Sequence, residues 1–267
     1  MPSEHSSDVK FEIGHVLFID IVGYSKLLIN EQSEQIQKLK GIVRHAEQVR
    51  LAEAEGKLLR LPTGDGGALV FRNSPEAPVL CALEIAKELK KHPELRVRMG
   101  IHSGPVNEVT DLNEQANIAG AGINIAQRVM DCGDAGHILL SKHVADDLEQ
   151  YEHWRRLLHE LGPCEVKHGV RIDIANLYSD EVGNSELPKK FQALKKHRAR
   201  MRWAEAAIAV VVLAAIVAAF VFLLRRPSRS ATAIDFSGMA IDLFSLGVLR
   251  GAAASFRRAS TNLSKAK

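Results

Sequence analysis

Two aspartates stand where carboxylates could hold a divalent cation. Asp20 ends the apolar run His15 to Asp20 (HVLFID), which is typical of a strand buried on both faces. Asp65 lies in the glycine-rich stretch 63–67, between two short apolar runs, and this pattern is typical of a hairpin turn. If the two strands are neighbours, the carboxylates meet at one edge of a sheet. Oxygen ligands suit Mg²⁺ or Mn²⁺. Taken alone, Asp20 could be a helix or turn cap and Asp65 part of an ordinary Asp-Gly turn.

Asn124 and Arg128 form a second pair. They are four residues apart and therefore share one face of a helix that we expect at Ile123 to Met130. A guanidinium can bind a phosphate through two hydrogen bonds and an amide can bind a sugar oxygen, so the pair could orient a nucleotide. The alternative is an ordinary solvated face of an amphipathic helix.

Alternating short strands and helices must position these residues. We expect strands at 15–20, 57–61, 68–71, 95–102, 137–140, 164–167 and 170–177, and helices at 31–55, 75–91, 123–130 and 141–149. Ser103-Gly104-Pro105 is expected to close the fourth strand, and Ser141 to cap the last helix. This β-α-β-β-α-β order predicts an α+β, ferredoxin-like fold with helices on one face of a largely antiparallel sheet.

Charge and cysteine content exclude several classes of protein. Residues 1–180 contain 20 Lys and Arg against 27 Asp and Glu, a net charge of −7, whereas residues 181–267 contain 15 against 5, a net charge of +10. A two-metal enzyme acting on nucleic acid would need a basic groove on the folded part, so we expect no nucleic-acid partner. Three cysteines without a CxxC pair indicate a reducing compartment, and Cys132 and Cys164 are expected to be buried thiols.

A membrane segment explains the basic C-terminal part. Residues 206–224 are 19 consecutive apolar residues, or roughly 28 Å of helix, close to the thickness of a bilayer core. Seven basic residues precede this run and three follow it, which predicts that the preceding domain is cytoplasmic. We expect a disordered lead-in (1–10), a folded domain (11–180), a basic juxtamembrane linker (181–203), a single-pass helix in the inner or plasma membrane (204–224) and a tail of unassigned role (225–267).

Four ordered motifs carry a family resemblance. They are Phe18–Ser25 (FIDIVGYS), Thr63–Gly66 (TGDG), Arg98–Val106 (RMGIHSGPV) and Gly122–Arg128 (GINIAQR). Together they resemble the successive motifs of class III adenylate and guanylate cyclase catalytic domains. The resemblance extends from Val16 to Tyr178 and implies the cyclase fold for the folded part.

The resemblance also implies roles for the polar residues. Class III domains dimerise head to tail, and each site is shared between two chains. Asp20 and Asp65, helped by the backbone carbonyl of Ile21, would bind two Mg²⁺ or Mn²⁺ ions. From the partner chain, Asn124 would orient the ribose and Arg128 would stabilise charge on the α-phosphate, while Lys167 resembles a lysine that contacts the distal phosphates. The 3′-hydroxyl would attack the α-phosphorus and release pyrophosphate.

Two positions depart from the family pattern at the base-binding site. Family adenylate cyclases have a Lys four residues before the second metal aspartate and an Asp or Thr seven residues before the ribose asparagine, and guanylate cyclases commonly have Glu and Cys. This chain has Leu61 and Asn117. Leucine cannot hydrogen-bond a base, whereas an asparagine amide can serve either purine. Arg60 or Thr63 could compensate, and the bacterial-looking architecture favours ATP over GTP.

The sequence therefore predicts a membrane-tethered homodimeric cyclase that converts ATP to 3′,5′-cyclic AMP for signal transduction. Two alternatives stay open. One is a guanylate cyclase, and the other is a catalytically degenerate cyclase-fold module that binds nucleotide or dimerises for signalling. The missing base-reading lysine supports the degenerate module, and the presence of Asp20, Asp65, Asn124 and Arg128 argues against it.

Overall fold

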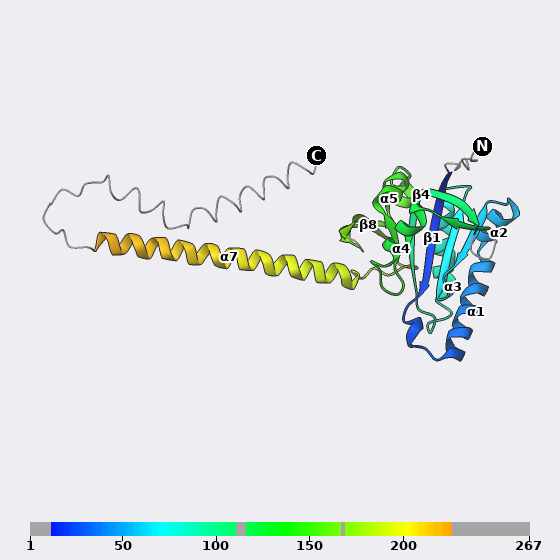
Figure 1. Cartoon of the computed structure of the whole chain (residues 1–267), viewed down its shortest axis with the longest axis horizontal. Helices are drawn as coiled ribbons and strands as arrows, with labels where there is room; N and C mark the ends of the chain where they lie inside the picture. Colours follow the sequence, from blue (N-terminus) through cyan, green and yellow to red (C-terminus); the bar gives the residue numbers. More distant parts are fainter. Residues whose placement is uncertain (1–11, 111–115, 167–168, 226–267) are drawn as a thin grey trace, which may run out of the picture. The chain divides into compact units, whose positions relative to one another are not determined.

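The computed structural model describes residues 12–110, 116–166 and 169–225 (Figure 1). The predicted lead-in 1–10, Lys167 and the tail after residue 225 lie outside these residues. The strands are β1 (Glu12–Ile21), β2 (Leu58–Pro62), β3 (Gly66–Phe71), β4 (Val97–Thr110), β5 (Ala116–Ala119), β6 (Ile138–Ser141), β7 (Leu158–Glu165) and β8 (Arg171–Leu177). The helices are α1 (Ile29–His45), α2 (Glu47–Ala54), α3 (Ala77–Leu89), α4 (Ala121–Met130), α5 (Lys142–Leu148), α6 (Glu152–Arg155) and α7 (Lys189–Leu224), with a short 3-10 helix η1 (Tyr24–Lys26).

The strands form one mixed sheet. Its order is β2-β3-β1-β4-β6-β8-β7, and β5 pairs with the far end of β4. β4 and β6 run parallel, while every other strand pair among the described residues is antiparallel. This agrees with the predicted α+β class. β1 is central, so its last residues lie between the hairpin β2–β3 on one side and β4 on the other.

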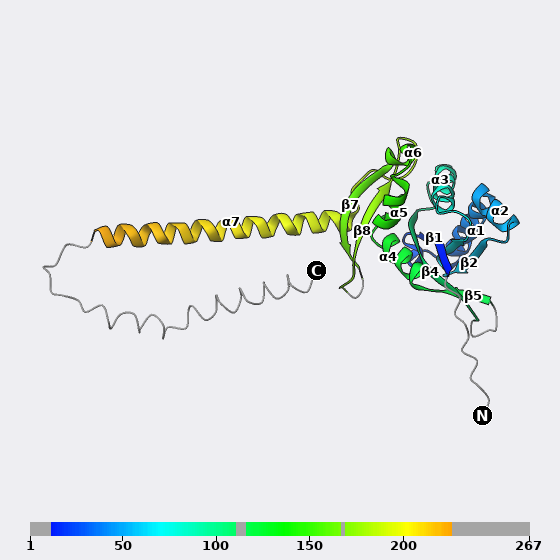
Figure 2. The same ribbon diagram turned by 90° about the horizontal axis from the view of Figure 1, so that it is seen from above.

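The two faces of the sheet are covered by different helices (Figure 2). Leu17, Ile19 and Ile21 of β1 face a core shared with α1, α2, α3 and α5. Val16 and Phe18 point to the opposite face, where they pack with residues of α4. The expectation that all helices lie on one face is therefore wrong, because α4 returns across the other side of the sheet.

A glycine in β4 allows α4 to approach the sheet closely. A Cβ atom at Gly100 would lie 2.4 Å from the backbone nitrogen of Met130 and 2.6 Å from the carbonyl oxygen of Ala126. No side chain larger than hydrogen fits between these backbones. Gly100 therefore fixes the distance between β4 and the helix that carries Asn124 and Arg128.

Three local predictions are wrong. The helix expected at 31–55 is interrupted at Ala46, whose ψ of 134° is extended, and α2 starts in a new direction at Glu47. The break lets Val49 and Ala52 reach the core beneath α3. No glycine or proline marks it. The fourth strand does not end at Ser103 either.

β4 continues through Pro105 because that proline lies where one neighbour is missing. β6 pairs only with Met99–Ile101 of β4, and β5 pairs from Asn107 onward. The absent proline N–H therefore interrupts no ladder on that side. Ser141 precedes α5 as predicted, but its hydroxyl makes no cap and bonds Nδ1 of His102 at 2.8 Å.

The chain divides into two units, Met1–Ala204 and Glu205–Lys267. The helix α7 begins in the first unit, so the basic segment 189–203, predicted as a linker, is helical. Phe191 in its first turn is buried in the folded domain. Within the described residues, Trp203–Phe222 is long and apolar enough to cross a membrane, judged by length and composition.

Candidate active site

Asp20 lies at the end of β1 with its side chain on the α4 face of the sheet. It is opposite Arg98 in the β1–β4 register. Nε and Nη2 of Arg98 donate to one carboxylate oxygen of Asp20 at 2.9 and 2.7 Å. The residue is only 8% exposed, so this guanidinium compensates a buried negative charge.

The hairpin places Asp65 beside Asp20. The backbone N–H of Ile21 donates to the carbonyl of Asp65 at 3.1 Å, and Thr63 Oγ1 lies 3.5 Å from Asp65 Oδ1. A Cβ at Gly66 would lie 2.0 Å from the carbonyl oxygen of Ile19, so only glycine lets the hairpin lie this close to β1. The predicted meeting of the two carboxylates at one sheet edge is therefore present in the structure.

The electrostatics of Asp20 reflect this crowding. Burial raises the pKa of Asp20 to about 6, the hydrogen bonds and charge of Arg98 oppose the rise, and the neighbouring Asp65 carboxylate adds to it. Two carboxylates held together in a partly desolvated position favour an added positive charge. Arg98 supplies one such charge, and a divalent cation could supply more.

Arg98 has a second acidic partner. Its Nη2 lies 3.1 Å from Oδ1 of Asp131, the residue that follows α4. Arg98 stands in the third sequence motif, but sequence reasoning assigned it no role. A charged side chain between the apolar Val97 and Met99 was the available signal, since a strand position that faces a buried surface needs a partner for its charge.

The donor set fits a divalent cation. Among the described residues no group of three or more His, Cys, Asp or Glu side chains is close enough to hold a metal. Asp20 and Asp65 provide two carboxylates, and the backbone carbonyl of Ile21 would be the third ligand. This oxygen-only set suits Mg²⁺ or Mn²⁺, which commonly complete their coordination with water and substrate phosphates.

Asn124 and Arg128 lie on the outward side of α4. Asn124 is exposed and Arg128 half-buried, whereas Ile123 and Ala126 are buried against the sheet. The two therefore share one helix face, as their spacing predicts. In the part of the chain that the structure describes, no hydrogen bond or ion pair joins either side chain to Asp20 or Asp65. One chain brings the carboxylates together and leaves this second pair apart from them.

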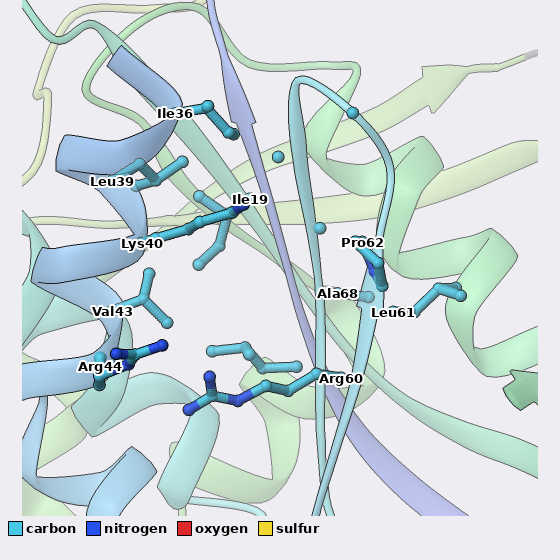
Figure 3. A pocket seen from close by; sticks show the side chains of 14 residues that line it. Ile19, Ile36, Leu39, Lys40, Val43, Arg44, Arg60, Leu61, Pro62 and Ala68 are labelled. Carbon is cyan, nitrogen blue, oxygen red and sulfur yellow. The ribbon is translucent and has the colours of Figure 1, made fainter. Parts of the chain in front are cut away.

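Leu61 and Arg60 point to opposite faces of β2. Leu61 packs against the apolar cluster that includes Phe18 and Ala68, on the face that also carries Asp20. Arg60 extends into a cavity of about 430 Å³ between α1 and the hairpin, where it approaches Arg44 (Figure 3). Arg60 also pairs with Glu53 at 2.7 Å. Arg60 is therefore poorly placed to replace a base-reading residue at position 61.

The remaining predicted residues are Asn117, Lys167 and Thr63. Asn117 lies in β5, opposite Val109 of β4. Lys167 falls outside the described residues. The hydroxyl of Thr63 lies near the Asp65 carboxylate in the hairpin, so Thr63 is a neighbour of the two carboxylates.

Comparisons with known proteins identify the fold. Residues 78–176 match the family model of the adenylate and guanylate cyclase catalytic domain. The chain is 23% identical over 154 residues to "Putative adenylate cyclase 3" of Rhizobium meliloti (strain 1021). The aligned region covers 55% of this chain and 24% of that protein. The chain thus spans about a quarter of the length of this relative.

Solved cyclase structures share the fold. The adenylyl cyclase CyaB from P. aeruginosa superimposes with a TM-score of 0.53 at 18% identity, over 66% of this chain and all of that chain. The guanylate cyclase domain of RhGC from Catenaria anguillulae, solved with GTP, gives a TM-score of 0.51 at 23% identity, over 63% of this chain and 97% of that one. The resemblance to class III cyclases is confirmed. The family match includes Asn124 and Arg128 and begins after Asp65.

Proposed function

We propose that this class III cyclase domain is an active purine nucleotide cyclase that works as a homodimer and uses ATP. The 3′-hydroxyl of the ribose attacks the α-phosphorus, the bond to the β-phosphate oxygen breaks, and 3′,5′-cyclic AMP and pyrophosphate result. The observation that carries the proposal is the buried Asp20 carboxylate, which the hairpin places beside Asp65 and which Arg98 neutralises. A domain used only for dimerisation has no need of such a costly buried pair.

Asp20, Asp65 and the carbonyl of Ile21 would hold two Mg²⁺ or Mn²⁺ ions. When bound, these ions neutralise the triphosphate and lower the pKa of the 3′-hydroxyl. Before a metal binds, Arg98 compensates the negative charge of Asp20. Because Asp131 already accepts from the same guanidinium at 3.1 Å, Asp20 can release Arg98 without leaving it unpaired.

Asn124 and Arg128 of a second copy would complete the site. Their outward position on α4 supports this, because a side chain can contact a second chain only if it faces away from the core of its own domain. Asn124 would orient the ribose through its amide, and Arg128 would stabilise the charge that develops on the α-phosphate. Lys167 would contact the distal phosphates.

The choice of base rests on Leu61 and Asn117. Leu61 offers an apolar wall on the face of Asp20, and Asn117 can donate to or accept from either purine. The relative carries the name "Putative adenylate cyclase 3" and one superimposed structure is that of an adenylyl cyclase, which supports ATP. A guanylate cyclase is the second candidate, supported by the superposition with the RhGC domain solved with GTP.

A single membrane span would tether the domain. The apolar segment Trp203–Phe222 supports a span, and the basic excess before it supports a cytoplasmic catalytic domain at the inner or plasma membrane. Phe191 anchors the start of α7 in the folded domain. Production of the cyclic nucleotide would therefore take place close to the membrane surface.

The test is product analysis with the full chain in detergent or lipid nanodiscs. The protein is incubated with ATP or GTP and Mn²⁺ or Mg²⁺, and cyclic nucleotide and pyrophosphate are followed by mass spectrometry. Cyclic AMP in excess of cyclic GMP is expected. Excess cyclic GMP would favour the second candidate, and no product from a dimer that binds nucleotide would establish the degenerate module.

A further inference from the structure

Two of the three cysteines meet inside the domain. Cys132 follows α4 and Cys164 lies in β7, 32 residues later. Their sulfur atoms are 2.6 Å apart, and both residues are at most 1% exposed. Sulfur atoms joined in a disulfide are ~2.05 Å apart, so a small movement would suffice to bond them. Both are free thiols in this structure.

A lysine from the first turn of α7 lies at this pair. Nζ of Lys190 is 3.7 Å from the sulfur of Cys132. Apolar side chains pack around the pair, and the acidic Glu165 follows Cys164 in the chain. The apolar residues are Val129, Leu139, Val166, Ile174 and Phe191. Lys190 and Phe191 come from the same turn, so the root of α7 covers the sulfur pair.

The two thiols differ in reactivity. The hydrogen bond from the Cys132 thiol lowers the pKa of Cys164 to about 7 against the effect of burial, and the charge of Lys190 helps. The pKa of Cys132 is raised, first by the same hydrogen bond and then by burial. One member of the pair is therefore the better thiolate and the other keeps its proton. Such asymmetry is typical of an attacking and a resolving cysteine.

We propose that Cys132 and Cys164 are a reversible disulfide site, oxidised by a small hydroperoxide such as hydrogen peroxide. The thiolate of Cys164 attacks one peroxide oxygen, the O–O bond breaks, and a sulfenic acid and hydroxide form. The sulfur of Cys132 then attacks the sulfenic sulfur, the S–O bond breaks, and the leaving hydroxide takes the Cys132 proton as water. Two thiols lose two electrons in all, and the peroxide is reduced to two waters.

The bond would form next to the helix that carries Arg128. The sulfur of Cys132 lies 3.4 Å from the carbonyl oxygen of Arg128, one turn earlier in α4, so drawing this sulfur toward Cys164 would disturb the end of the helix. Oxidation should therefore shift the end of α4 and lower cyclase turnover about tenfold, an effect that rests on the proposed function.

The third cysteine provides an internal control. Cys81 in α3 is fully buried, has no cysteine beside it among the described residues, and has its pKa raised by burial. It shares the burial of the pair but not the sulfur partner or the lysine. A reagent that reaches buried thiols without selection would modify all three alike.

The experiment maps thiols in the full chain, held in nanodiscs and treated with graded hydrogen peroxide. After denaturation and alkylation, peptide mass spectrometry should show a Cys132–Cys164 cross-link that dithiothreitol reverses. Cys81 should remain a reduced thiol that is alkylated, and its oxidation should be at least about tenfold slower. Equal oxidation of all three thiols, or no cross-link at a dose that oxidises Cys81, would overturn the proposal.

Variants separate the two roles. Cys132→Ser should leave a sulfenic acid at Cys164 that dimedone traps, and Cys164→Ser should leave Cys132 reduced. Lys190→Gln should slow cross-linking, whereas Lys189→Gln, at an exposed neighbour, should not. The mapping requires no cyclase activity. A cross-link without any cyclic nucleotide would therefore contradict the proposed function and leave the disulfide site standing.

Discussion

The carboxylate pair and the outward face of α4 differ in how their side chains are held. Asp20 and Asp65 are fixed by contacts within one chain, through Arg98, the Ile21 backbone and the glycine at position 66. Among the residues that the structure describes, no hydrogen bond or ion pair joins Asn124 or Arg128 to that pair, although Gly100 fixes the helix that carries them. On the proposed function, one half of the site is built inside the fold and a second copy supplies the other half.

The largest effect should come from the internal half. Asp65→Asn keeps the shape of the hairpin but removes a negative charge, so we expect cyclase activity to fall at least about 100-fold. Activity is measured with saturating Mn²⁺ and ATP. Asp173→Asn, an exposed aspartate of β8, is the matched control and should retain activity. Metal-dependent activity that survives Asp65→Asn would mean that this carboxylate is not a ligand.

Mixing two inactive variants tests whether the halves come from different chains. Asp20→Ala and Arg128→Ala are each expected to be inactive as homodimers. A statistical mixture should recover about a quarter of wild-type activity, because half of the dimers are mixed and each regains one of two sites. Subunit exchange is verified with differently tagged chains. Proven exchange without recovered activity would contradict a shared site.

A smaller effect is expected where the halves touch. Asp131→Asn weakens the interaction between Arg98 and residue 131. The guanidinium should therefore stay on Asp20 and compete with the metal for that carboxylate. We expect Mn²⁺ affinity to fall by about three- to tenfold. The readout is Mn²⁺ titration followed by electron paramagnetic resonance, with Asp134→Asn as the comparison. Unchanged affinity in Asp131→Asn would show that Asp131 does not help to release Arg98 from Asp20.

Acid should destabilise the folded domain through the buried histidine of β4. His102 on β4 bonds Ser141 and lies near His143, and burial, then the charge of His143, lowers its pKa to about 4. The unfolded chain binds this proton near pH 6.5 and the folded chain does not, so stability present above pH 6.5 is lost as pH falls toward 4.

The loss attributable to His102 should approach about 3 kcal/mol across that range. It is measured by denaturant unfolding at several pH values. His102→Gln should flatten the dependence, after allowance for the lost bond to Ser141. An equal slope in the variant would assign the acid sensitivity to other groups, such as His15, whose pKa burial also lowers.

Local patterns predicted the elements that carry the site. The apolar run before Asp20, the glycines around Asp65 and the four-residue spacing of Asn124 and Arg128 each reflect backbone geometry within a short window. The partners of Arg98 could not be found in this way. Asp20 and Asp131 are separated from it by 78 and 33 residues, and only the strand register and the return of α4 across the sheet bring the three together.

Other misses have the same physical origin. The chain bends at Ala46 because the core beneath α3 accepts Val49, and no residue nearby signals the bend. Pro105 looked like a strand end, yet it is tolerated where β4 lacks a neighbour. In both cases tertiary packing overrode the structure that the local sequence favours.

The two outer strands of the sheet have a bearing on solubility. β2 and β7 end the strand order, and each contains a proline, Pro62 in one and Pro163 in the other. A proline interrupts the row of backbone donors that an unprotected edge would offer to a neighbouring molecule. Edge-to-edge stacking of sheets, a common start of aggregation, is thereby discouraged at both margins of the domain.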